Sequence, residues 1–479
     1  MDPHLTLDYR GLSFWHDTVP GDLHQRTPLD GDVHTDVAII GGGLTGLWAA
    51  HYLLARDGRL AITVIEKEIA GFGASGRNGG WCSALFPRST ASLERAHGRS
   101  AAIAMRRAMI DTVDEVGRVT AAEGIDCHFV KGGTLAFARS AAQLRSARAE
   151  VAEAALYGVD ALELRGSGGA APGRTRGARG SRNTGDPGHS RLGASGALGA
   201  VFDPACARLH PARLVRGLAA SLERRGVNIV EGTEVTSYAP GAIHTTRGTV
   251  YSPVIIQATE GYGAMIAQSH RDILPLYSLM VATEPLPDEF WQRVGIAHGQ
   301  TFTDFRHLLV YGQRTADNRF AFGGRGARYH WGSAVNASYD RSPTVFEHLR
   351  RTLVDLFPDA ADAAITHRWG GPLGVPRDWH ASVRFDPATG LGSAGGYVGD
   401  GLSTTNLAGR TLADLITRTD SSLVRLPWVG HQSPRWEPEP LRFAAANAGL
   451  LAMGVADAEE RVTGRPSIAA RAMGPLVGH

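Results

Sequence analysis

The chain has 479 residues, of which 43% are hydrophobic and 20% charged, a composition typical of soluble globular proteins. This length exceeds what one compact core accommodates, so we expect at least two domains. The 49 Lys and Arg residues nearly cancel the 47 Asp and Glu residues, and this balance disfavours a nucleic-acid-binding protein.

The cysteines indicate a reducing compartment. Cys82, Cys127 and Cys206 are few, odd in number and without CxxC spacing, which disfavours a disulfide framework and suits the cytoplasm. Residues 1–17 lack the pattern of a secretory signal, and no apolar run reaches the roughly 18 residues of a membrane span. The histidines follow no metal-binding spacing, so we expect a cytoplasmic protein with no membrane span and no metal site.

Residues 35–66 predict a βαβ unit. The apolar run 37–40 is the first strand, 44–54 has a helical pattern, and 61–66 is the second strand. Both strands are apolar at successive positions, as in parallel strands that are buried on two faces.

The turn between the first strand and the helix has the pattern G-x-G-x-x-G. Gly41 permits the tight turn, Gly43 lets the backbone approach a pyrophosphate, and Gly46 lets the helix pack closely on the strand. The free N–H groups of the helix N-terminus attract phosphate. Glu66, at the end of the second strand, can accept both ribose hydroxyls and would repel a 2′-phosphate, which disfavours NADP. The unit therefore predicts a dinucleotide site.

A long segment with almost no large apolar residues follows the first helices of the chain. The pattern predicts helices over 92–123 and 140–157 and a strand over 133–138. Residues 165–196 are rich in Gly, Arg and Ser and cannot bury enough surface to offset their ordering entropy, so we expect a mobile surface loop. An RNA-binding tract and a local reading-frame slip are the alternatives.

The rest of the chain changes from a parallel to an antiparallel pattern. The predicted elements are helix 211–226, strands 227–240 and 248–259, an antiparallel sheet within 275–330, helix 343–357, strands 369–386 and 391–397, and helix 401–416. Residues 421–479 form a tail with one more helix. The change of period predicts a second domain with its own sheet.

Two glycine-rich segments favour FAD over NAD. The loop 71–81, GFGASGRNGGW, can cover phosphates and a second ring system. The stretch 395–416 supplies a second glycine turn that opens a second helix. Two distant glycine turns suit a ligand with two distant ends.

Five motifs in order carry a family resemblance: GGGLTGLWAA, IEKEIAGFGASGRNGG, HPARLVRGLA, RWGGPLGVPRD and GGYVGDGLSTTNLAGR. The chain resembles the D-amino-acid oxidase/glycine oxidase (DAO) family of FAD-dependent oxidoreductases over about residues 13–164 and 200–420, and within it the gamma-glutamylputrescine-oxidase-like branch. The resemblance implies an α/β fold (α+β overall), with a Rossmann-type FAD-binding domain and a mostly antiparallel-sheet substrate domain.

The implied domains are interleaved along the chain. The FAD-binding domain comprises residues 30–90, 200–265 and 365–420. The substrate domain comprises residues 91–199 and 266–364, including the loop 165–196, and residues 421–479 form a C-terminal helical tail.

The resemblance also implies roles for individual residues. Glu66 holds the adenosine ribose, Val235 meets the adenine through its backbone, and Ala258 and Thr259 lie near the pyrophosphate. The whole predicted FAD-binding set is Gly41, Gly43, Leu44, Thr45, Gly46, Glu66, Lys67, Gly73, Ala74, Ser75, Arg77, Asn78, Gly79, Gly80, Val235, Ala258, Thr259, Gly371, Gly399, Gly401, Leu402, Ser403 and Thr404.

In enzymes of this kind the flavin does the difficult chemistry. The resemblance implies that an amine or amino acid loses a hydride from its α-carbon to flavin N5, that the imine hydrolyses, and that O2 reoxidises the flavin with release of H2O2. No side-chain base is required. The positive end of helix 401–416 can stabilise the reduced ring.

Six residues are candidates for the reaction and for substrate binding, and one of them is Asp400 in the second glycine turn. Arg325 is a candidate cation beside the ring, and Trp369 a candidate flavin neighbour. Arg306 and Arg314 flank Tyr311 and could bind a substrate carboxylate, as arginines in amino-acid sites do. For each arginine the alternative is a surface ion pair.

The chain departs from the family at three places. The loop 76–80 has no histidine and 368–378 has no cysteine, so neither supplies the covalent FAD link of some relatives, and we expect non-covalent FAD. Asp400 stands where many relatives have His or Asn, and a carboxylate there would oppose negative charge on the ring. A flavin monooxygenase and a catalytically silent flavin-binding partner protein therefore remain as alternatives. The amine, the electron acceptor and the oligomeric state are not determined by the sequence.

Overall fold

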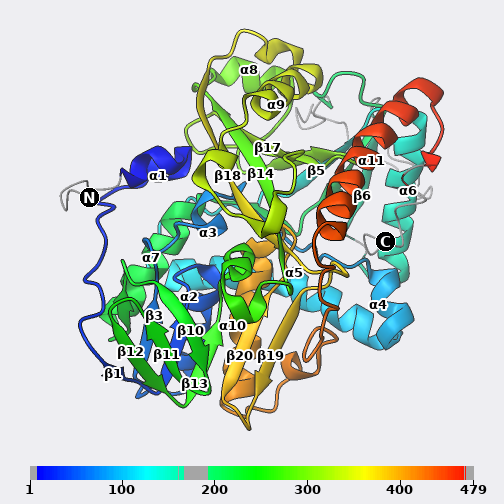
Figure 1. The fold of residues 1–479 in the computed structure, drawn as a ribbon. Coiled ribbons are helices and arrows are strands. Elements are labelled where there is room, and N and C mark those ends of the chain that lie inside the picture. Colours follow the sequence, from blue (N-terminus) through cyan, green and yellow to red (C-terminus); the bar gives the residue numbers. More distant parts are fainter. Residues whose placement is uncertain (1–7, 160, 167–191, 469, 471–479) are drawn as a thin grey trace, which may run out of the picture.

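Two large sheets organise the chain, one below the other in Figure 1. The computed structural model describes residues 8–159, 161–166, 192–468 and 470. The lower sheet with its helices is here called the nucleotide half, after the predicted dinucleotide site, and the upper sheet with its helices is called the upper half. The α/β fold that the motifs imply is confirmed.

The lower sheet has six strands in the order β19-β20-β13-β2-β3-β9. Its strands are β2 (Val37–Ile40), β3 (Ile62–Ile65), β9 (Asn228–Val230), β13 (Val254–Gln257), β19 (Ser382–Asp386) and β20 (Leu391–Gly395). All neighbours are parallel except β19, which runs antiparallel to β20. The carboxyl ends of β2, β3, β13 and β20 therefore share one edge.

Both faces of this sheet are covered, which explains the continuous apolar runs. Val37 and Ile39 pack in one cluster with the helices, whereas Ala38 and Ile40 pack against a second, four-stranded sheet. The helices are α2 (Leu44–Arg56), α5 (Arg99–Ala122), α7 (Pro211–Arg224) and α10 (Gly401–Ile416). The four-stranded sheet, in the order β1-β12-β11-β10, consists of β1 (Val33–His34), β10 (Val235–Ala239), β11 (Gly241–Thr245) and β12 (Gly248–Ser252).

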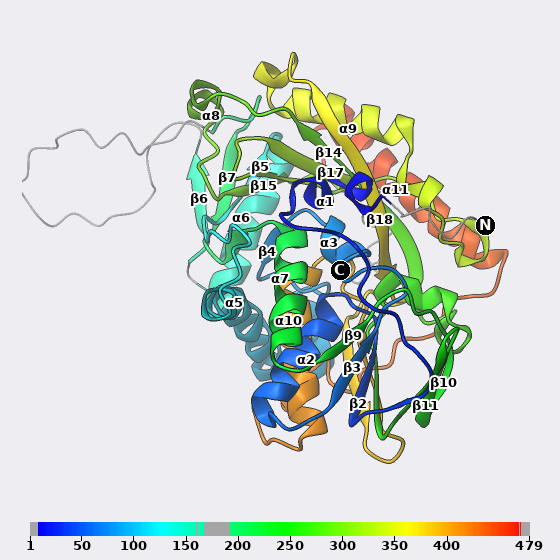
Figure 2. The same ribbon diagram turned by 90° about the vertical axis from the view of Figure 1, so that its left-hand side faces the viewer.

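The upper sheet has eight strands in the order β18-β14-β17-β16-β15-β5-β7-β6. They are β5 (Thr134–Ala138), β6 (Glu163–Gly166), β7 (Gly199–Asp203), β14 (Leu274–Thr283), β15 (Thr301–Asp304), β16 (Val310–Arg314), β17 (Phe320–Arg325) and β18 (Ile365–Val375). All pairs are antiparallel except β15 with β5. Helices α8 (Asp288–Val294) and α9 (Pro343–Leu356) lie above this sheet in Figure 2.

Further α-helices and strands connect the two halves or flank them. They are α1 (Phe14–Thr18), α3 (Ala74–Arg77), β4 (Trp81–Ser83), α4 (Thr90–His97), α6 (Ala141–Leu156), β8 (Cys206–Arg208) and α11 (Leu441–Thr463). Strand β4 pairs with β8, and α11 runs along the upper half in Figure 1. No helix in the described ranges combines the length and the apolarity that a membrane crossing needs.

The structure differs from the expected elements in a few places. Gly98, with a φ of +84°, divides the helix predicted over 92–123 into α4 and α5. In the segment predicted as a loop, Arg165 and Gly166 belong to β6, while 167–191 lie outside the described residues.

Two strands also lie across the expected domain boundaries. Strand β18 pairs with β14 and β7 pairs with β5, so both belong to the upper sheet although the boundaries assign them to the FAD-binding segments. Helix α5, by contrast, shares the core of the nucleotide half. The reason is that hydrogen-bond pairing and packing, and not position along the chain, decide membership of a sheet.

The crossing of α2 and α10 is the tightest helix contact of the nucleotide half. A Cβ built on Gly409 would lie 2.6 Å from the carbonyl carbon of Trp48 and 2.7 Å from its Cβ. Both groups belong to the rigid part of α2, so they cannot rotate away. The two helix backbones approach this closely only because residue 409 has no side chain.

Replacing this glycine should destabilise the protein. We expect Gly409→Ala to lower the free energy of unfolding by about 1–3 kcal/mol through overpacking, as measured by denaturant unfolding. The matched control is Gly454→Ala in α11, where an added Cβ meets nothing within 4 Å. That variant should gain about 0.5–1 kcal/mol from helix propensity. Equal effects of the two substitutions would contradict the close crossing.

Candidate functional site

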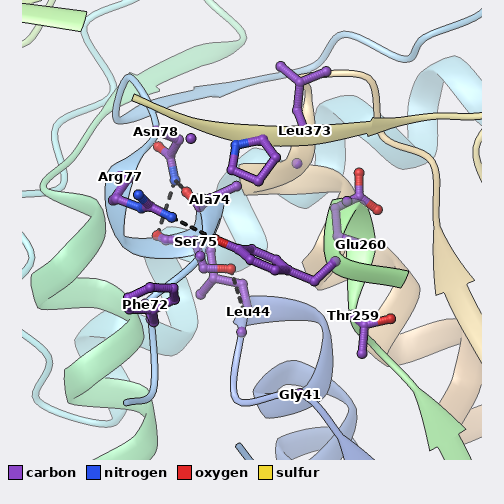
Figure 3. A pocket seen from close by; sticks show the side chains of 18 of the residues that line it. Gly41, Leu44, Phe72, Ala74, Ser75, Arg77, Asn78, Thr259, Glu260 and Leu373 are labelled. Atoms are coloured by element: carbon purple, nitrogen blue, oxygen red, sulfur yellow. Dashed lines mark hydrogen bonds between the residues drawn. The ribbon is translucent and has the colours of Figure 1, made fainter. Parts of the chain in front are cut away.

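A cavity of about 430 Å³ lies between the two halves, at the shared carboxyl edge of the six-stranded sheet. Both glycine turns line it: Gly41 and Gly43 before α2, and Gly399 and Gly401 at the start of α10. Figure 3 shows the first turn below the cavity and Leu373 of β18 above it. In parallel sheets, ligands bind at this edge.

The first glycine turn fits a dinucleotide. Gly41 has a φ of +111°, and a Cβ there would lie 2.6 Å from the carbonyl oxygen of Ala258. A Cβ on Gly46 would lie 2.3 Å from the carbonyl oxygen of Gly41, so this glycine packs the helix on the strand and does not line the cavity. The bare backbone of Gly41 and Gly43 leaves the helix N-terminus open to phosphate.

Glu66 stands at the end of β3 in the wall of the cavity. Its carboxylate accepts hydrogen bonds from the backbone N–H groups of Gly42, at 2.8 Å, and Glu68, at 2.9 Å. Desolvation outweighs these two hydrogen bonds and raises the pKa of Glu66 to about 7. The nearby Glu231 and Glu68 act in the same direction.

Residues 71–81, the loop predicted to cover the cofactor, are here called the cofactor loop. This loop is held by its own hydrogen bonds and by the first glycine turn. The Ser75 hydroxyl accepts a hydrogen bond from the backbone N–H of Leu44 at 2.8 Å. The Asn78 side chain donates to the carbonyl oxygen of Ala74 at 3.0 Å and accepts from the N–H of Gly80 at 2.8 Å. Figure 3 shows Ser75, Arg77 and Asn78 gathered on one side of the cavity.

A buried ion pair joins this loop to the upper half. Arg77 contacts Asp340 at 2.6 Å, donates to the Tyr262 hydroxyl at 2.7 Å and stacks over Phe72 at 5.0 Å. The Arg77 Nε and the Asp340 Oδ1 are buried and have no hydrogen-bond partner in the described part of the chain. Both residues line the cavity.

The opposite end of the cavity carries a cation and a carboxylate. The Arg325 guanidinium donates to the carbonyl oxygen of Val398 at 2.5 Å and lies over the Trp379 ring at 5.5 Å. Burial lowers the pKa of Arg325, and Asp400 opposes this shift. Burial likewise raises the pKa of Asp400 to about 6, with Arg325 acting against it. The pair shares one site, so each charge moderates the other.

Tyr311 closes this end of the cavity against the loop. A Cβ on Gly79 would lie 2.5 Å from the Tyr311 ring, and the ring stacks near Trp81 with centroids 6.3 Å apart. The Tyr311 hydroxyl lies 2.8 Å from the Ser278 hydroxyl. Aromatic side chains from β4 and β16 therefore form one wall of the cavity.

Most of the residues predicted to bind FAD line this one cavity. They are Gly41, Gly43, Leu44, Thr45, Glu66, Lys67, Gly73, Ala74, Ser75, Arg77, Asn78, Gly79, Val235, Ala258, Thr259, Gly371, Gly399, Gly401 and Leu402. Of the candidates for catalysis and substrate binding, Arg325, Asp400 and Tyr311 line it as well.

The two other candidate arginines do not line the cavity. Arg306 makes a bidentate pair with Asp304, its Nε at 2.7 Å from Oδ1, and Arg314 pairs with Asp288 at 3.1 Å. Arg314 and Tyr311 lie three residues apart on β16, hence on opposite faces of the sheet, because side chains alternate along a strand. The ion-pair alternative describes both arginines.

Four further candidates support the cavity from behind. The Trp369 indole N–H donates to the carbonyl oxygen of Arg77 at 2.8 Å and so fixes the loop. Gly80, with a φ of +64°, packs under Gln313. Ser403 donates to the carbonyl oxygen of Ser83, and Thr404 to that of Asp400.

The sequence reasoning missed several residues of the cavity wall, among them Glu260, Tyr262 and Asp340. Glu260 has a φ of +44° and accepts hydrogen bonds from the N–H groups of Gly396, at 2.9 Å, and Tyr397, at 3.3 Å. Burial raises its pKa to about 7. An acid directly after a buried strand was the available signal for Glu260. Asp340 had none, since only the fold brings it to Arg77.

The titratable side chains do not suggest a metal centre. Within the described ranges, His, Cys, Asp and Glu form no group of three or more that could hold a metal ion. Cys82, Cys127 and Cys206 are all free and buried.

Known proteins resemble the chain along most of its length. The family model for FAD-dependent oxidoreductases of the DAO type matches residues 36–415. A probable oxidoreductase OrdL of Rhizobium meliloti is 30% identical, over 85% of this chain and 88% of the relative. The gamma-glutamylputrescine oxidoreductase of Escherichia coli is 27% identical, over 81% and 85% of the two chains.

A solved structure agrees at the level of the fold. The glycine oxidase of Geobacillus kaustophilus superposes with a TM-score of 0.66 at 19% identity, over 83% of this chain and 99% of the other. The region that the family model matches, residues 36–415, includes both glycine turns, Glu66 and every strand of the six-stranded sheet. The chain therefore belongs to the DAO family of FAD-dependent oxidoreductases and is an enzyme.

Proposed function

We propose that this enzyme oxidises an amine or an amino acid at the bond between its α-carbon and its nitrogen. The observation that carries the proposal is the single cavity that runs from Glu66 and the first glycine turn to Arg325 and Asp400 at the second. When bound, FAD supplies a hydride acceptor, and the product imine hydrolyses in water. The names of two relatives, gamma-glutamylputrescine oxidoreductase and glycine oxidase, support this substrate class.

The adenine half of the cofactor is assigned to the end of the cavity that contains Glu66. Its carboxylate accepts the two ribose hydroxyls, and the N–H groups that begin α2 face the pyrophosphate. Val235 and Ala258 line the same end. Attachment is non-covalent, because the loop of residues 76–80 offers no histidine and 368–378 no cysteine.

Substrate is assigned to the opposite end, where the lining residues come from the upper sheet. Tyr277, Leu309 and Tyr311 supply apolar surface, and Arg325 supplies a cation. An arginine held on a backbone carbonyl and an indole ring has few other conformations, so it is pre-organised to bind an anionic group. When the substrate carboxylate binds Arg325, the α-carbon of the substrate points into the cavity.

Asp400 changes the net charge at this end of the cavity when it gains or loses its proton. When ionised it offsets the charge of Arg325, and when protonated it leaves that charge uncompensated. Because burial raises the pKa of Asp400 to about 6, both states are accessible near neutral pH. Its position at the start of α10 also places a proton donor at the positive end of that helix.

Oxygen is the proposed electron acceptor, with H2O2 as the product. A fixed cation in a partly buried site stabilises negative charge that develops on oxygen, and Arg325 meets this requirement. A flavin monooxygenase would need a second site for a reducing nucleotide. The second G-x-G-x-x-G of the sequence, residues 71–76, precedes only the four-residue helix α3 and lines the same cavity as the first, so it does not supply a separate site.

An anaerobic screen tests the proposed substrate class. Amino acids, N-alkyl amino acids and polyamine conjugates are mixed with the FAD-loaded enzyme, and bleaching of the flavin absorbance is recorded. We expect at least one of these amines to bleach the flavin, and air to restore the colour with stoichiometric H2O2. Bleaching by NADPH alone would favour the monooxygenase, and bleaching by no amine would favour a silent flavin protein.

Cofactor affinity should depend on pH through Glu66. The apo carboxyl has a pKa near 7, and accepting two hydroxyls favours its ionised form, so binding releases a proton below pH 7. We expect the Kd for FAD to fall by up to tenfold per pH unit as pH rises towards 7, and to level off above it. The Glu66→Gln variant should bind FAD more weakly, with a flatter profile. Identical slopes of Kd against pH in both proteins would contradict the role of Glu66. Separately, acid precipitation should release the flavin, and flavin that stays with the precipitated protein would contradict non-covalent attachment.

Substrate affinity should depend on Asp400. Protonation below pH 6 adds one net positive charge beside Arg325, which favours a carboxylate-bearing substrate. We expect KM for such a substrate to rise by about three- to tenfold as pH increases through 6, and to be lower and flat in Asp400→Asn. A substrate without a carboxylate should show neither effect. Asp420→Asn, an exposed acid paired with Arg425, is the matched control.

A further inference from the structure

A second cavity, of about 140 Å³, lies behind the cofactor loop and shares no lining residue with the first. Four segments of the chain meet there: α1, the residue His128 after α5, the β8–α7 connection, and the turn between β16 and β17. Figure 2 shows α1 close above α7. At roughly 30 Å³ for each water molecule, the cavity has room for an ion of roughly five or six non-hydrogen atoms.

Two arginines with unused hydrogen-bond donors line this cavity. Arg208 is only 1% exposed, and no carboxylate in the described part of the chain forms an ion pair with it. Its Nη1 donates to the carbonyl oxygen of His128 at 3.1 Å, and its Nε is buried without a partner. Arg213 pairs with the exposed Asp126 at 3.2 Å, and its Nε is also buried without a partner.

Other groups add to the positive potential of this cavity. Helix α7 begins at its wall, where the positive end of the helix attracts anions, although the His210 side chain already accepts a hydrogen bond from the N–H of Arg213 at 3.2 Å and Pro211 has no N–H to donate. Burial and the charges of Arg213 and Arg208 lower the pKa of His128, against the opposite effect of Asp126 and Asp317, so this histidine itself adds no positive charge. The one acid in the wall, Asp317, is already paired with Arg319 at 2.7 Å.

One acceptor in the wall restricts the kind of anion. Gln313 donates from Nε2 to the carbonyl oxygens of Gly79, at 2.6 Å, and Leu209, at 3.2 Å, and these two bonds fix the orientation of its amide. The Gln313 Oε1 is therefore a true acceptor, and it is buried without a partner. A ligand that satisfies the cavity must accept from the arginines and also donate one hydrogen bond.

We propose that this cavity binds a small oxyanion that carries a hydroxyl hydrogen, either inorganic phosphate or a small hydroxycarboxylate. Its oxygens accept from the Nε–H groups of Arg208 and Arg213, and its hydroxyl donates to the Gln313 Oε1. Sulfate, which has no proton at neutral pH, leaves that oxygen unsatisfied. The site neutralises the buried charge of Arg208, and Gln313 connects it to the carbonyl of Gly79 in the cofactor loop.

Calorimetric titration of the FAD-loaded protein at pH 7.5 tests the proposal, with phosphate, sulfate, lactate and acetate at matched ionic strength. We expect one phosphate or one lactate bound per chain, and an affinity at least tenfold weaker for sulfate than for phosphate and for acetate than for lactate. The stronger of the two binding ligands identifies the natural class. Absence of saturable binding by all four anions would overturn the proposal, and equal binding of phosphate and sulfate would overturn the role of Gln313.

Variants locate the site. Arg208→Met and, independently, Arg213→Gln should each weaken binding at least tenfold, and Arg208→Met in anion-free buffer should melt no lower than the wild type because it removes an unpaired buried charge. Arg293→Met, which removes an exposed arginine paired with Asp359, is the control and should bind as the wild type does. Binding that survives both cavity variants would assign the anion to another place and overturn the proposal.

Discussion

The close crossing of α2 and α10 is the constraint on which the cofactor site depends. Both helices follow parallel strands of one sheet, and at Gly409 their backbones approach within a distance that excludes any side chain. Their N-termini therefore open on the same edge, and two glycine turns that are far apart in sequence face one cavity. Widening the crossing would separate the two turns, so the length of ligand that the site accepts is set by this packing.

The second constraint is the buried pair of Arg77 and Asp340, which ties the cofactor loop to the upper half. Trp369 holds the same loop through the carbonyl of Arg77, and Tyr311 packs on Gly79. An ion pair of this kind costs desolvation and is retained where it fixes a position. Here it holds the wall of the cavity in place.

The sequence was most informative where function and local structure coincide. The strand, glycine turn, helix and acid of residues 37–66 follow from short-range rules, and the structure reproduces them within a few residues. Arg306 and Arg314 could not be assigned in this way, because strand alternation and a nearby carboxylate turn them to other partners. Asp340 and Tyr262 lay beyond any local pattern, since only tertiary packing brings them to Arg77. The sequence showed which residue types were present, but it did not determine which distant residues pack against one another.

The order of strands in the six-stranded sheet has a consequence for biosynthesis. Strand β2 pairs on one side with β3, at residues 62–65, but its other edge pairs with β13, at residues 254–257, and β13 in turn pairs with β20, at residues 391–395. Because β2 is apolar on both faces, the emerging chain exposes one unpaired, apolar edge of the β2–β3 pair until residues 254–257 have been synthesised. The six-stranded sheet therefore forms late, because its neighbouring strands are far apart in the sequence, and its folding competes with aggregation during translation.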